Sequence, residues 1–471
     1  MREKKHRLKY ILLDLFSAIL AWGTFNAYRE IYFSESQFKC TFYYFTKTEF
    51  WIALFILPFL WVSLYYLFGH YREIWRRSLL IEFWQTMLAS LIGSTVMFFG
   101  LLLDDNVLSY KDYYYVFVAL FLIHFVTTWF FRYLFTSYTL HQINRGKIGF
   151  KTLLLGNNSK ASQLYHTLNK QDETYGYDFV GYVSLSGEPD IELDKDLKFL
   201  GALHKLQEII REHRIQEIII AIESSDHEVI NSVLMQLRQQ DVIIKAIPSL
   251  SEMLSGRVRL SFFLGEPLVV VNHDLMKPWQ KNFKRIFDII FSFTGLVLLS
   301  PFIIFIILGI KLTSKGPVFY LQERIGKNEQ PFLIFKFRSM YVDAEKEGPQ
   351  LSCGNDPRIT RFGRFMRKNR IDELPQFINV LKGDMSVVGP RPERKFYIKK
   401  IMEKAPYYTM LLTVRPGITS WGAVKYGYTE NVEQMFEQLK FDIYYVRNMS
   451  LLLDFKILFK TISVVLNGSG K

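Results

Sequence analysis

Cysteine is scarce in this sequence, whose 471 residues include only Cys40 and Cys353. Two cysteines exclude a disulfide scaffold and any cysteine-rich zinc or iron–sulfur site. Low-complexity segments are also lacking, and the charged residues, 22% of the chain, are well mixed, which excludes a disordered chain. Acidic residues are in deficit, and the net charge of +13 favours anionic partners such as nucleic acid, lipid headgroups or phosphorylated small molecules.

Apolar residues are concentrated at the start of the chain. Four long apolar runs lie near residues 8–28, 50–68, 83–103 and 113–135, and each is close to the roughly 20 residues that a membrane helix needs. One such run could be a core helix, but four in succession, with Trp and Tyr near their ends, favour a membrane bundle. Asp14 interrupts the first run and no small-residue cleavage site follows it, so we expect no cleaved secretory signal.

Basic residues between the apolar runs predict the orientation of this bundle. They gather in residues 1–9, 72–77 and 145–151, whereas residues 104–112 contain one basic residue, Lys111. Because basic loops stay on the cytoplasmic side, the N-terminus and everything after the fourth run are predicted to be cytoplasmic. We therefore expect a four-helix transmembrane bundle over residues 1–145.

Residues 146–272 have a different pattern, in which short apolar strands alternate with helices, as in a parallel, Rossmann-like α/β layer. The strands are expected at 152–156, 217–222 and 241–247, and the helices at 159–170 and near 227–240. The first strand ends at Gly156, like a dinucleotide site, but that motif needs G-x-G-x-x-G/A. Asn158 stands at its middle glycine, which favours a structural turn over a cofactor site.

A fifth apolar run, residues 286–310, contains Ser300 and Pro301 at its middle, and proline breaks a helix by removing a hydrogen bond. Both flanks of the run are basic, whereas a true span would place one basic cluster outside. We therefore predict a re-entrant membrane helix over about 284–311 that breaks at Ser300 and Pro301 and returns to the same face. The alternative is a kinked transmembrane helix, which natural bundles tolerate.

Residues 357–371 contain six basic residues and no acidic one. Arginines recur there at every third position between apolar residues, which predicts a basic amphipathic helix at a membrane surface. Nucleic-acid binding is a weaker interpretation, because the chain contains no recognisable DNA or RNA module, and we expect no nucleic acid as a partner.

Two adjacent carboxylates, Asp372 and Glu373, directly follow this basic run. Pro375 favours the first turn of a helix, so both carboxylates are predicted at a helix N-terminus, a position that also suits a phosphate. A carboxylate there can hold Mg²⁺ beside substrate phosphates or attack phosphorus to form an acyl phosphate. Taken alone, the pattern favours an ordinary acidic helix start.

Rigid basic segments accompany these carboxylates. Arg391 lies between two prolines, an extended setting that suits bidentate recognition of phosphate. Lys336 and Arg338 lie upstream, and Arg415 begins a basic turn downstream. Together they predict a site for a metal-bound diphosphate at a membrane surface.

From about residue 281 onwards the sequence resembles the bacterial sugar transferase family, the polyprenyl-phosphate glycosyl-1-phosphate transferases. The segments that carry the resemblance are K-R-I-F-D at 284–288, S-P-F at 300–302, G-P-V-F at 316–319, K-F-R-S-M at 336–340, D-P-R-I-T-R-F-G at 356–363, D-E-L-P-Q at 372–376, N-V-L-K-G-D-M-S-V-V-G-P-R-P at 379–392 and R-P-G-I-T-S-W at 415–421. With the preceding bundle and middle domain, the chain resembles the long, exopolysaccharide-initiating members.

The resemblance implies a two-step reaction. Asp372 would attack the sugar-linked phosphate of a UDP-sugar, release UMP and hold the phospho-sugar covalently, and undecaprenyl phosphate would then accept it. Glu373 would act as a metal ligand or general base, and Asp372 and Glu373 would hold Mg²⁺. The cations that would bind substrate are Lys336, Arg338, Arg367, Arg391 and Arg415.

The resemblance also implies the architecture and the location. Residues 273–471 would form an α/β phosphoglycosyl transferase domain on the cytoplasmic face of the bacterial inner membrane, in contact with its lipid, and the resemblance allows a homodimer. Family members often read G-I-T-G-W-A-Q-V after the R-P-G turn, and this chain has Ala423 in place of the Gln. The identity of the transferred sugar therefore stays open.

Two other functions stay open at this point. One is a non-catalytic membrane scaffold for a polysaccharide assembly complex, against which the intact D-E-L-P-Q beside G-P-R-P argues. The other is a nucleotide-sugar or NAD-dependent oxidoreductase that works through the middle domain, against which the incomplete glycine motif argues.

Overall fold

The structure is a computed structural model. Its chain divides into two compact units whose main parts are Met1–Ala202 and Val269–Lys471. The residues that the structure describes are 2–34, 45, 47–72, 74–102, 110–169, 176–185, 187–190, 193–222, 233, 236–237, 240, 242–247, 268–270, 276–342, 344, 356–427 and 432–466.

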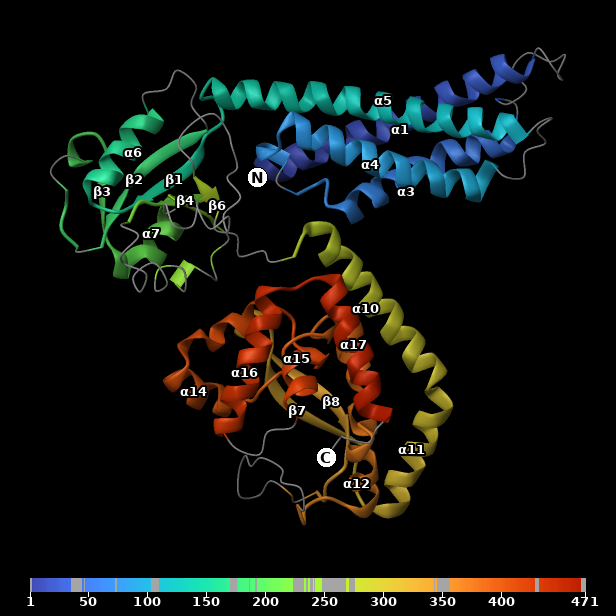
Figure 1. The fold of residues 1–471 in the computed structure, drawn as a ribbon, viewed down its shortest axis with the longest axis vertical. Helices are drawn as coiled ribbons and strands as arrows, with labels where there is room; N and C mark the ends of the chain where they lie inside the picture. Colours follow the sequence, from blue (N-terminus) through green and yellow to red (C-terminus); the bar gives the residue numbers. More distant parts are fainter. Residues whose placement is uncertain are drawn as a thin grey trace. The chain divides into compact units, whose positions relative to one another are not determined.

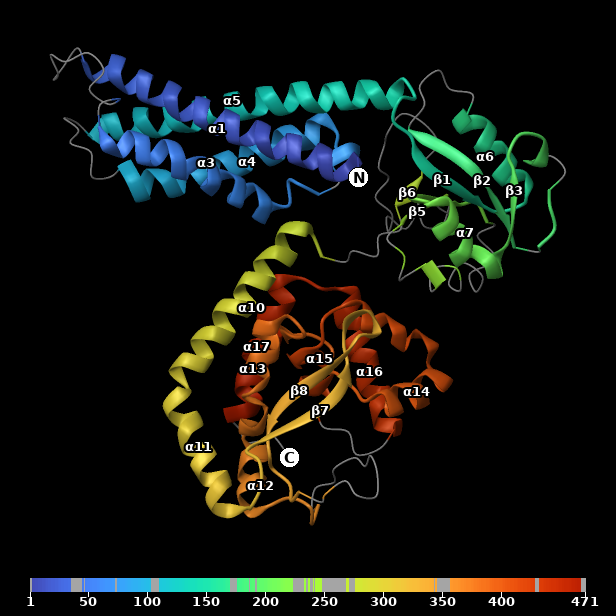
Figure 2. The same cartoon turned by 180° about the vertical axis from the view of Figure 1, so that it is seen from behind.

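The predicted N-terminal bundle is confirmed. The chain has four helices there that are long and apolar enough to cross a membrane, and they run side by side in Figures 1 and 2. Helix α1 packs against α3 and α5, and α4 packs against α3 and α5. Their bounds are α1 Arg2–Ser34, α3 Thr48–Phe68, α4 Leu79–Met97 and α5 Tyr110–Asn144, and the π-helical turn Phe98–Leu102 extends α4.

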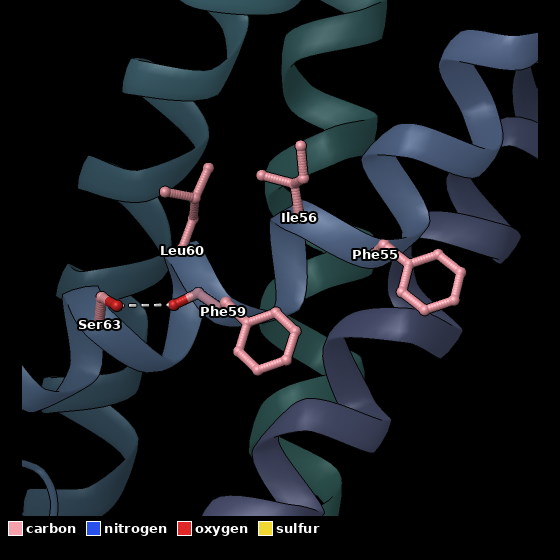
Figure 3. Close-up of a pocket in the computed structure, with 5 residues that line it drawn as sticks. All are labelled: Phe55, Ile56, Phe59, Leu60 and Ser63. Carbon is pink, nitrogen blue, oxygen red and sulfur yellow. Dashed lines mark hydrogen bonds between the residues drawn. The ribbon is translucent and has the colours of Figure 1, made fainter.

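The outer surface of the bundle is apolar, as lipid contact requires. A shallow hollow on α3 illustrates this surface (Figure 3), and its lining is formed by Phe55, Ile56, Phe59, Leu60 and Ser63. The Ser63 hydroxyl donates a hydrogen bond to the Phe59 carbonyl at 2.7 Å, which satisfies its polar group within the helix. No ionisable side chain lines this hollow, so we place no chemistry there.

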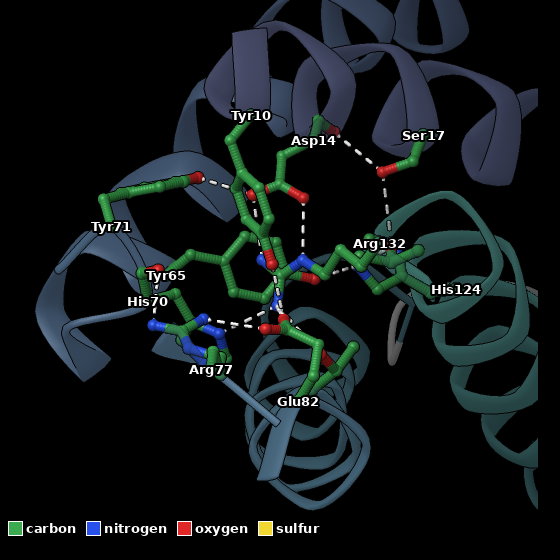
Figure 4. A network of polar contacts seen from close by, with 12 residues as sticks. Tyr10, Asp14, Ser17, Tyr65, His70, Tyr71, Arg77, Glu82, His124 and Arg132 are labelled. Carbon is green, nitrogen blue, oxygen red and sulfur yellow. Dashed lines mark hydrogen bonds and ion pairs between the residues drawn. The ribbon is translucent and has the colours of Figure 1, made fainter. Parts of the chain in front are cut away.

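The interior of the bundle, in contrast, contains a network of charged and polar side chains (Figure 4). Arg132 of α5 is fully buried and forms a bidentate pair with Asp14 of α1, at 2.8 Å for both bonds. It also lies 3.4 Å from Glu82 of α4, which in turn pairs with Arg77 at 3.0 Å. The Arg132 Nη1 also contacts the ring nitrogen of His70 at 2.8 Å. These bonds join segments from all parts of the bundle.

The middle of the chain forms a six-stranded sheet in the order β3-β2-β1-β4-β5-β6. Strand β1 pairs in parallel with β2 and β4, and β2 with β3, whereas β6 is antiparallel to β5. The elements are β1 Phe150–Leu155, α6 Ser159–Asn169, β2 Tyr177–Ser184, β3 Phe199–Ala202, α7 Leu206–His213, β4 Glu217–Ile220, β5 Ile243–Ala246 and β6 Val269–Val270.

The three expected strands and the helix after the first of them are confirmed. Strands β2 and β3 were not predicted, and the helix expected near 227–240 falls mostly outside the described residues. Packing explains the glycine at position 156, because a Cβ there would lie 2.5 Å from the Ala221 carbonyl oxygen. Gly156 also has a φ of +143°, which other residues rarely adopt. Asn158 caps α6 by accepting a hydrogen bond from the Ala161 N–H at 2.9 Å. Both contacts support the prediction of a structural turn.

The C-terminal domain combines two small sheets with short helices. Strands β7 and β8 form an antiparallel hairpin, and β9 and β10 form a parallel pair. Its core is formed by residues of both sheets and of the last helices, among them Val387, Tyr397, Tyr445 and Ile457. The elements are β7 Phe319–Ile325, β8 Pro331–Phe337, α12 Arg361–Lys368, η6 Ile371–Glu373, α13 Gln376–Lys382, β9 Ser386–Val388, α14 Lys395–Lys404, η7 Pro406–Thr413, β10 Gly417–Thr419, α15 Trp421–Lys425, α16 Val432–Arg447 and α17 Leu451–Leu466.

Two apolar helices, α10 Pro278–Leu298 and α11 Ser300–Thr313, run along one flank of this domain in both views. They are bent by 62° relative to each other, and the bend lies at Leu299, directly before the predicted break. Pro301 is in the first turn of α11, where its missing N–H is tolerated. The Ser300 hydroxyl donates to the Val297 carbonyl at 2.7 Å.

Both ends of this helix pair are bound to the same domain. Near the start of α10, Lys284 donates to the Val388 carbonyl at 2.9 Å, and Arg285 donates to the Val380 carbonyl at 2.8 Å. At the end of α11, Arg338 donates to the carbonyls of Ser314 and Lys315, at 2.9 Å each. The K-R-I-F-D segment therefore anchors the apolar helices.

Candidate active site

Asp372 and Glu373 lie on a single 3₁₀ turn, η6, between α12 and α13. The Thr360 hydroxyl caps α12 by accepting from the Gly363 N–H at 2.9 Å. The chain leaves α12 through Arg370, whose φ of 55° reverses its direction. The carboxylates thus precede α13 by a tight turn and do not form its first turn, and α12 is shorter than the predicted basic helix over 357–371. Both side chains are buried.

Cations from three separate segments surround the Glu373 carboxylate. It lies 3.5 Å from the Arg391 guanidinium, 3.8 Å from the Lys336 ammonium and 3.9 Å from the Arg370 guanidinium. Burial raises the pKa of the Glu373 carboxyl, but the positive charges of Arg391, Lys336 and Arg370 outweigh burial and hold that pKa below its usual range. Glu373 is therefore held as an anion.

The neighbouring Asp372 carboxylate has a different environment. Among the described residues, no side chain or backbone N–H donates a hydrogen bond to it. Burial and the negative charge of Glu373 raise the pKa of the Asp372 carboxyl, although Lys336, Arg367 and Arg391 oppose this. Glu373 is thus held by cations, whereas Asp372 accepts no hydrogen bond from the described residues. Two adjacent carboxylates in such different environments are frequent at functional sites.

Lys336 is the last but one residue of β8, and its side chain points its charge at the carboxylate pair. Burial lowers the pKa of Lys336 to about 8, although the charge of Glu373 opposes this shift. Asn379 of α13 fixes the position of β8, because its side-chain amide accepts from the Phe335 N–H at 2.9 Å and donates to the Leu333 carbonyl at 2.7 Å. The strand that carries Lys336 is thereby held against the helix that follows the carboxylates.

Arg391 is presented by a backbone that is held on both sides. The Gly389 N–H donates to the Thr419 carbonyl at 3.0 Å, and the Gly417 N–H donates to the Pro390 carbonyl at 2.9 Å. A Cβ at Gly389 would lie 2.5 Å from the Arg415 carbonyl oxygen, so only glycine permits this close approach. The prolines at 390 and 392 restrict the same backbone further.

The remaining predicted cations divide into two groups. Arg367 of α12 donates to the Ser339 hydroxyl at 2.8 Å, and its charge acts on Asp372, so it belongs to the site. Arg338 instead binds the end of α11. Arg415 is exposed and donates to the Gly383 carbonyl at 2.9 Å. In the described structure, Arg338 and Arg415 bind backbone carbonyls outside the carboxylate pair.

Sequence reasoning missed three residues around the site. Arg370 contacts Glu373, and Glu393 lies 3.0 Å from Arg324 and 4.0 Å from Arg391. Asp442 of α16 is buried, and burial raises its pKa to about 7. Arg370 could have been noticed, since it lies two residues before Asp372, but Asp442 lies in an ordinary helical pattern that carries no local signal.

The carboxylate pair fits the binding of Mg²⁺. Among the described residues, no group of three or more acidic, histidine or cysteine side chains could hold a metal ion by itself. Mg²⁺, however, is usually bound through one or two carboxylates together with substrate phosphates. The unbonded Asp372 carboxylate beside Glu373 supplies that donor set.

Two family models match the chain. The model described as bacterial sugar transferase matches residues 279–468, and the model described as CoA-binding domain matches residues 66–248. The first match contains every residue of the carboxylate site described above, whereas the second includes parts of the bundle and of the middle sheet.

Curated relatives match as well. The UDP-N-acetylgalactosamine-undecaprenyl-phosphate N-acetylgalactosaminephosphotransferase of Aeromonas hydrophila is 42% identical over 48% of this chain and 52% of its own length. A putative undecaprenyl-phosphate N-acetylgalactosaminyl 1-phosphate transferase of Bacillus subtilis is 49% identical over 27% of this chain and 72% of its own length. The chain thus spans little more than half the length of the Aeromonas relative.

A longer match comes from Salmonella typhimurium. Its undecaprenyl-phosphate galactose phosphotransferase is 31% identical over 71% of this chain and 72% of its own length. The match spans 363 residues, so the likeness extends beyond the C-terminal domain. The chain therefore belongs to the bacterial sugar transferase family.

Proposed function

We propose that this protein transfers a sugar 1-phosphate from a UDP-sugar to undecaprenyl phosphate, releases UMP and so initiates the synthesis of a surface polysaccharide or glycan. The observation that carries the proposal is the pair of buried carboxylates, of which Glu373 is held by three cations and Asp372 is left without a hydrogen-bond donor among the described residues. The activities named for the relatives of Aeromonas hydrophila and Salmonella typhimurium support the two substrates.

In the first step, an oxygen of Asp372 attacks the phosphorus that is bonded to the sugar. A bond forms between Asp372 and phosphorus, the phosphorus–oxygen bond to UMP breaks, and UMP leaves with that electron pair. In the second step, a phosphate oxygen of undecaprenyl phosphate attacks the same phosphorus. The aspartyl–phosphorus bond breaks, the Asp372 carboxylate is restored, and the lipid carries the phospho-sugar as a diphosphate.

The cations of the site supply the electrostatic part of this reaction. Lys336, Arg367, Arg370 and Arg391 bring four positive charges to two carboxylates, which leaves positive charge for the phosphates of the donor. Glu373 lies 3.5 Å from Arg391 and 3.8 Å from Lys336, and it orients both of them. Mg²⁺, held by Asp372 and Glu373, would offset the charge of the phosphates.

The release of UMP tests this proposal. The purified full-length protein in detergent receives Mg²⁺, undecaprenyl phosphate and one UDP-sugar at a time, with UDP-glucose, UDP-galactose and UDP-N-acetylgalactosamine in the panel. We expect UMP with one donor, dependent on the lipid phosphate and lost in Asp372→Asn. UMP formation that persists in that variant would reject Asp372 as the nucleophile, and a lack of UMP with every donor would favour the scaffold function.

We also propose that α10 and α11 form a re-entrant membrane helix, with the catalytic domain on the cytoplasmic side of the bacterial inner membrane. The bend of 62° and the attachment of both ends to one domain support this arrangement. In a variant whose two cysteines are replaced by serine, single cysteines at positions 281 and 315 are expected to react with a membrane-impermeant reagent from the same side. Labelling from opposite sides would indicate a kinked span.

For the middle domain we propose a Rossmann-like arrangement, supported by the parallel pairing of β1 with β2 and β4, and for the whole chain a homodimer. The match to a CoA-binding family model keeps a ligand of this domain open. Titration of the full-length protein with coenzyme A, NAD and UDP-sugars tests whether the middle domain binds a ligand. The mass of the protein in nanodiscs tests whether it forms a homodimer.

A further inference from the structure

The segment Gly389-Pro390-Arg391-Pro392 has one backbone N–H that the contacts described so far leave unassigned. Gly389 donates to Thr419, and the two prolines have no N–H to donate. The Pro390 carbonyl accepts from Gly417, and the Pro392 carbonyl accepts from Arg324 at 3.0 Å. The remaining donor is the N–H of Arg391, the residue whose guanidinium reaches Glu373.

The Asp442 carboxylate accepts that N–H. Asp442 belongs to α16 and is 4% exposed. Its carboxylate also accepts from the Gly422 N–H at 2.8 Å and from the Ser420 hydroxyl. One buried carboxylate thus joins α16, the start of α15 and the backbone of Arg391.

We propose that Asp442 is a positioning residue for the phosphotransfer, whose ionised carboxylate holds the Arg391 backbone so that its guanidinium is aimed at Glu373 and at the donor phosphates. This inference rests on the proposed function. The Asp442 carboxylate contacts the Arg391 backbone, and the Arg391 guanidinium contacts Glu373, so the effect of Asp442 on the carboxylate site passes through Arg391. Its role requires the charge, because three donors converge on it and a protonated carboxyl would present a fourth hydrogen to them.

The groups that face Asp442 determine when it is ionised. Arg391 faces it from the loop after β9, Tyr408 from η7 and Tyr445 from its own helix, while α15 contributes the Ser420 hydroxyl and the Gly422 N–H. Burial raises the pKa of both tyrosines well above the usual value, so they stay neutral. Burial raises the pKa of Asp442 to about 7, and its charge is therefore lost as the pH falls through that value.

Asp442→Asn in the full-length protein tests the inference. The variant keeps the shape of the side chain but presents an amide hydrogen to one of the three donors. We expect kcat/KM at pH 8 to fall by about 10- to 100-fold, the worth of a hydrogen bond to a charged group, mainly through kcat. We expect kcat/KM of the wild-type protein to have an acid limb near pH 7. In the variant this limb should move to lower pH, because the amide does not titrate.

Asp454→Asn is the matched control. Asp454 is also a buried carboxylate of this domain, but its partners are Lys284 at 2.7 Å and the Tyr445 hydroxyl at 2.6 Å, and not Arg391. We expect this variant to have a lower melting temperature and a wild-type pH profile. An Asp442→Asn protein that behaves in the same way, with unchanged kcat and pH profile, would show that Asp442 is merely structural and overturn the inference.

Action through Arg391 is tested by a double-mutant cycle. If Asp442 works only by holding Arg391, the double variant Asp442→Asn with Arg391→Ala loses no more activity than Arg391→Ala alone. Losses that multiply would contradict the inference. If the wild-type protein forms no product with any donor, the proposed function fails, and the cycle is not reached.

Ser420→Gly tests the same inference if the Asp442→Asn variant does not fold. It removes one hydrogen bond from the carboxylate, and glycine keeps most of the capping of α15. Because that hydrogen bond lowers the pKa of Asp442, its loss is expected to move the acid limb to higher pH, the opposite direction from Asp442→Asn. An unmoved limb would overturn the inference.

Discussion

Two of the buried clusters of charge in the described part of the chain differ in how their charges are balanced. In the transmembrane bundle, Asp14 and Glu82 meet Arg77 and Arg132, and each carboxylate is bonded to an arginine. In the C-terminal domain, Asp372 and Glu373 face four cations, and of these two carboxylates only Glu373 forms ion pairs among the described residues. The first cluster is complete without a ligand, whereas the second has both an unbonded carboxylate and surplus positive charge.

The difference separates structural from reactive charge. A buried ion pair that is fully satisfied costs about as much in desolvation as it returns, so its effect is mainly to join the helices that carry it. A buried carboxylate without a donor is unfavourable for the folded chain, and such strain is typical of functional sites. The bundle network and the carboxylate pair should therefore respond in opposite ways to substitution.

The largest effect is expected for the unbonded carboxylate. Asp372→Asn should lower kcat by more than about 10⁴-fold, as removal of a nucleophile does. Because burial and the charge of Glu373 raise the pKa of Asp372, its ionised form is unfavourable in the folded state, and the neutral amide should leave the melting temperature equal or higher. A thermal melt beside the UMP assay checks both; a lower melting temperature would mean that Asp372 is a structural carboxylate.

Substitution in the bundle network should instead lower the melting temperature and leave kcat unchanged. Arg132→Met leaves Asp14 buried without its partner, and breaking a buried pair in this way costs about 3–5 kcal/mol. We expect a lower melting temperature and normal kcat in the protein that remains folded. The double variant Arg132→Met with Asp14→Leu should recover much of the loss, because no unpaired charge remains. A lost kcat in the folded fraction of Arg132→Met would show that the bundle takes part in the chemistry.

Two arginines in the same local sequence setting sharpen the comparison within the C-terminal domain. Arg391 and Arg415 both precede a proline, but Arg391 contacts Glu373 and Arg415 contacts a backbone carbonyl. Arg391→Ala should lower kcat/KM by about 100-fold, the loss of a charged contact to a buried anion, and Arg415→Ala by less than about 3-fold. Equal losses would place Arg415 on the substrate.

The smallest effect is a pH dependence. Burial lowers the pKa of Lys336 to about 8, so kcat/KM should fall about tenfold between pH 7 and pH 9 as the ammonium loses its proton. Lys336→Arg, whose charge persists, should remove this alkaline limb. The free energy of unfolding should change in the opposite direction. Lys336 has a pKa of about 8 in the folded state and 10.5 in the unfolded state, so between these values the unfolded state binds more protons. The stability of the folded protein should therefore rise with pH in this range. A limb that persists in the arginine variant would exclude Lys336 as its source.

Much of the fold was predictable because its signals are local. The length of each apolar run predicted the four membrane helices, and the alternation of apolar strands with helices predicted β1, α6, β4 and β5. Strands β2 and β3 were missed because their pattern is only partly apolar. The carboxylate pair was predictable because Asp372 and Glu373 are adjacent in the sequence.

The partners of those carboxylates were predicted only in part. Lys336 and Arg338 are two residues apart, but one reaches Glu373 and the other binds the end of α11. Arg391 and Arg415 occur in similar motifs and are placed differently. Sequence spacing does not determine which surface a long side chain meets, because that depends on which distant segment packs beside it.

By itself, the sequence determined the four membrane helices, the elements β1, α6, β4 and β5 of the middle domain, and the adjacent carboxylates Asp372 and Glu373, since each depends on neighbouring residues. Only the tertiary structure decided which charges are paired. Asp14 and Arg132 are 118 positions apart, and Arg391 and Asp442 lie on separate segments, so long-range packing alone brings them together. Among the described residues, packing gives Asp14 hydrogen bonds from Arg132 and Tyr71 and gives Asp372 none. In a buried, weakly polarisable interior, a charge without such bonds is costly for the folded chain.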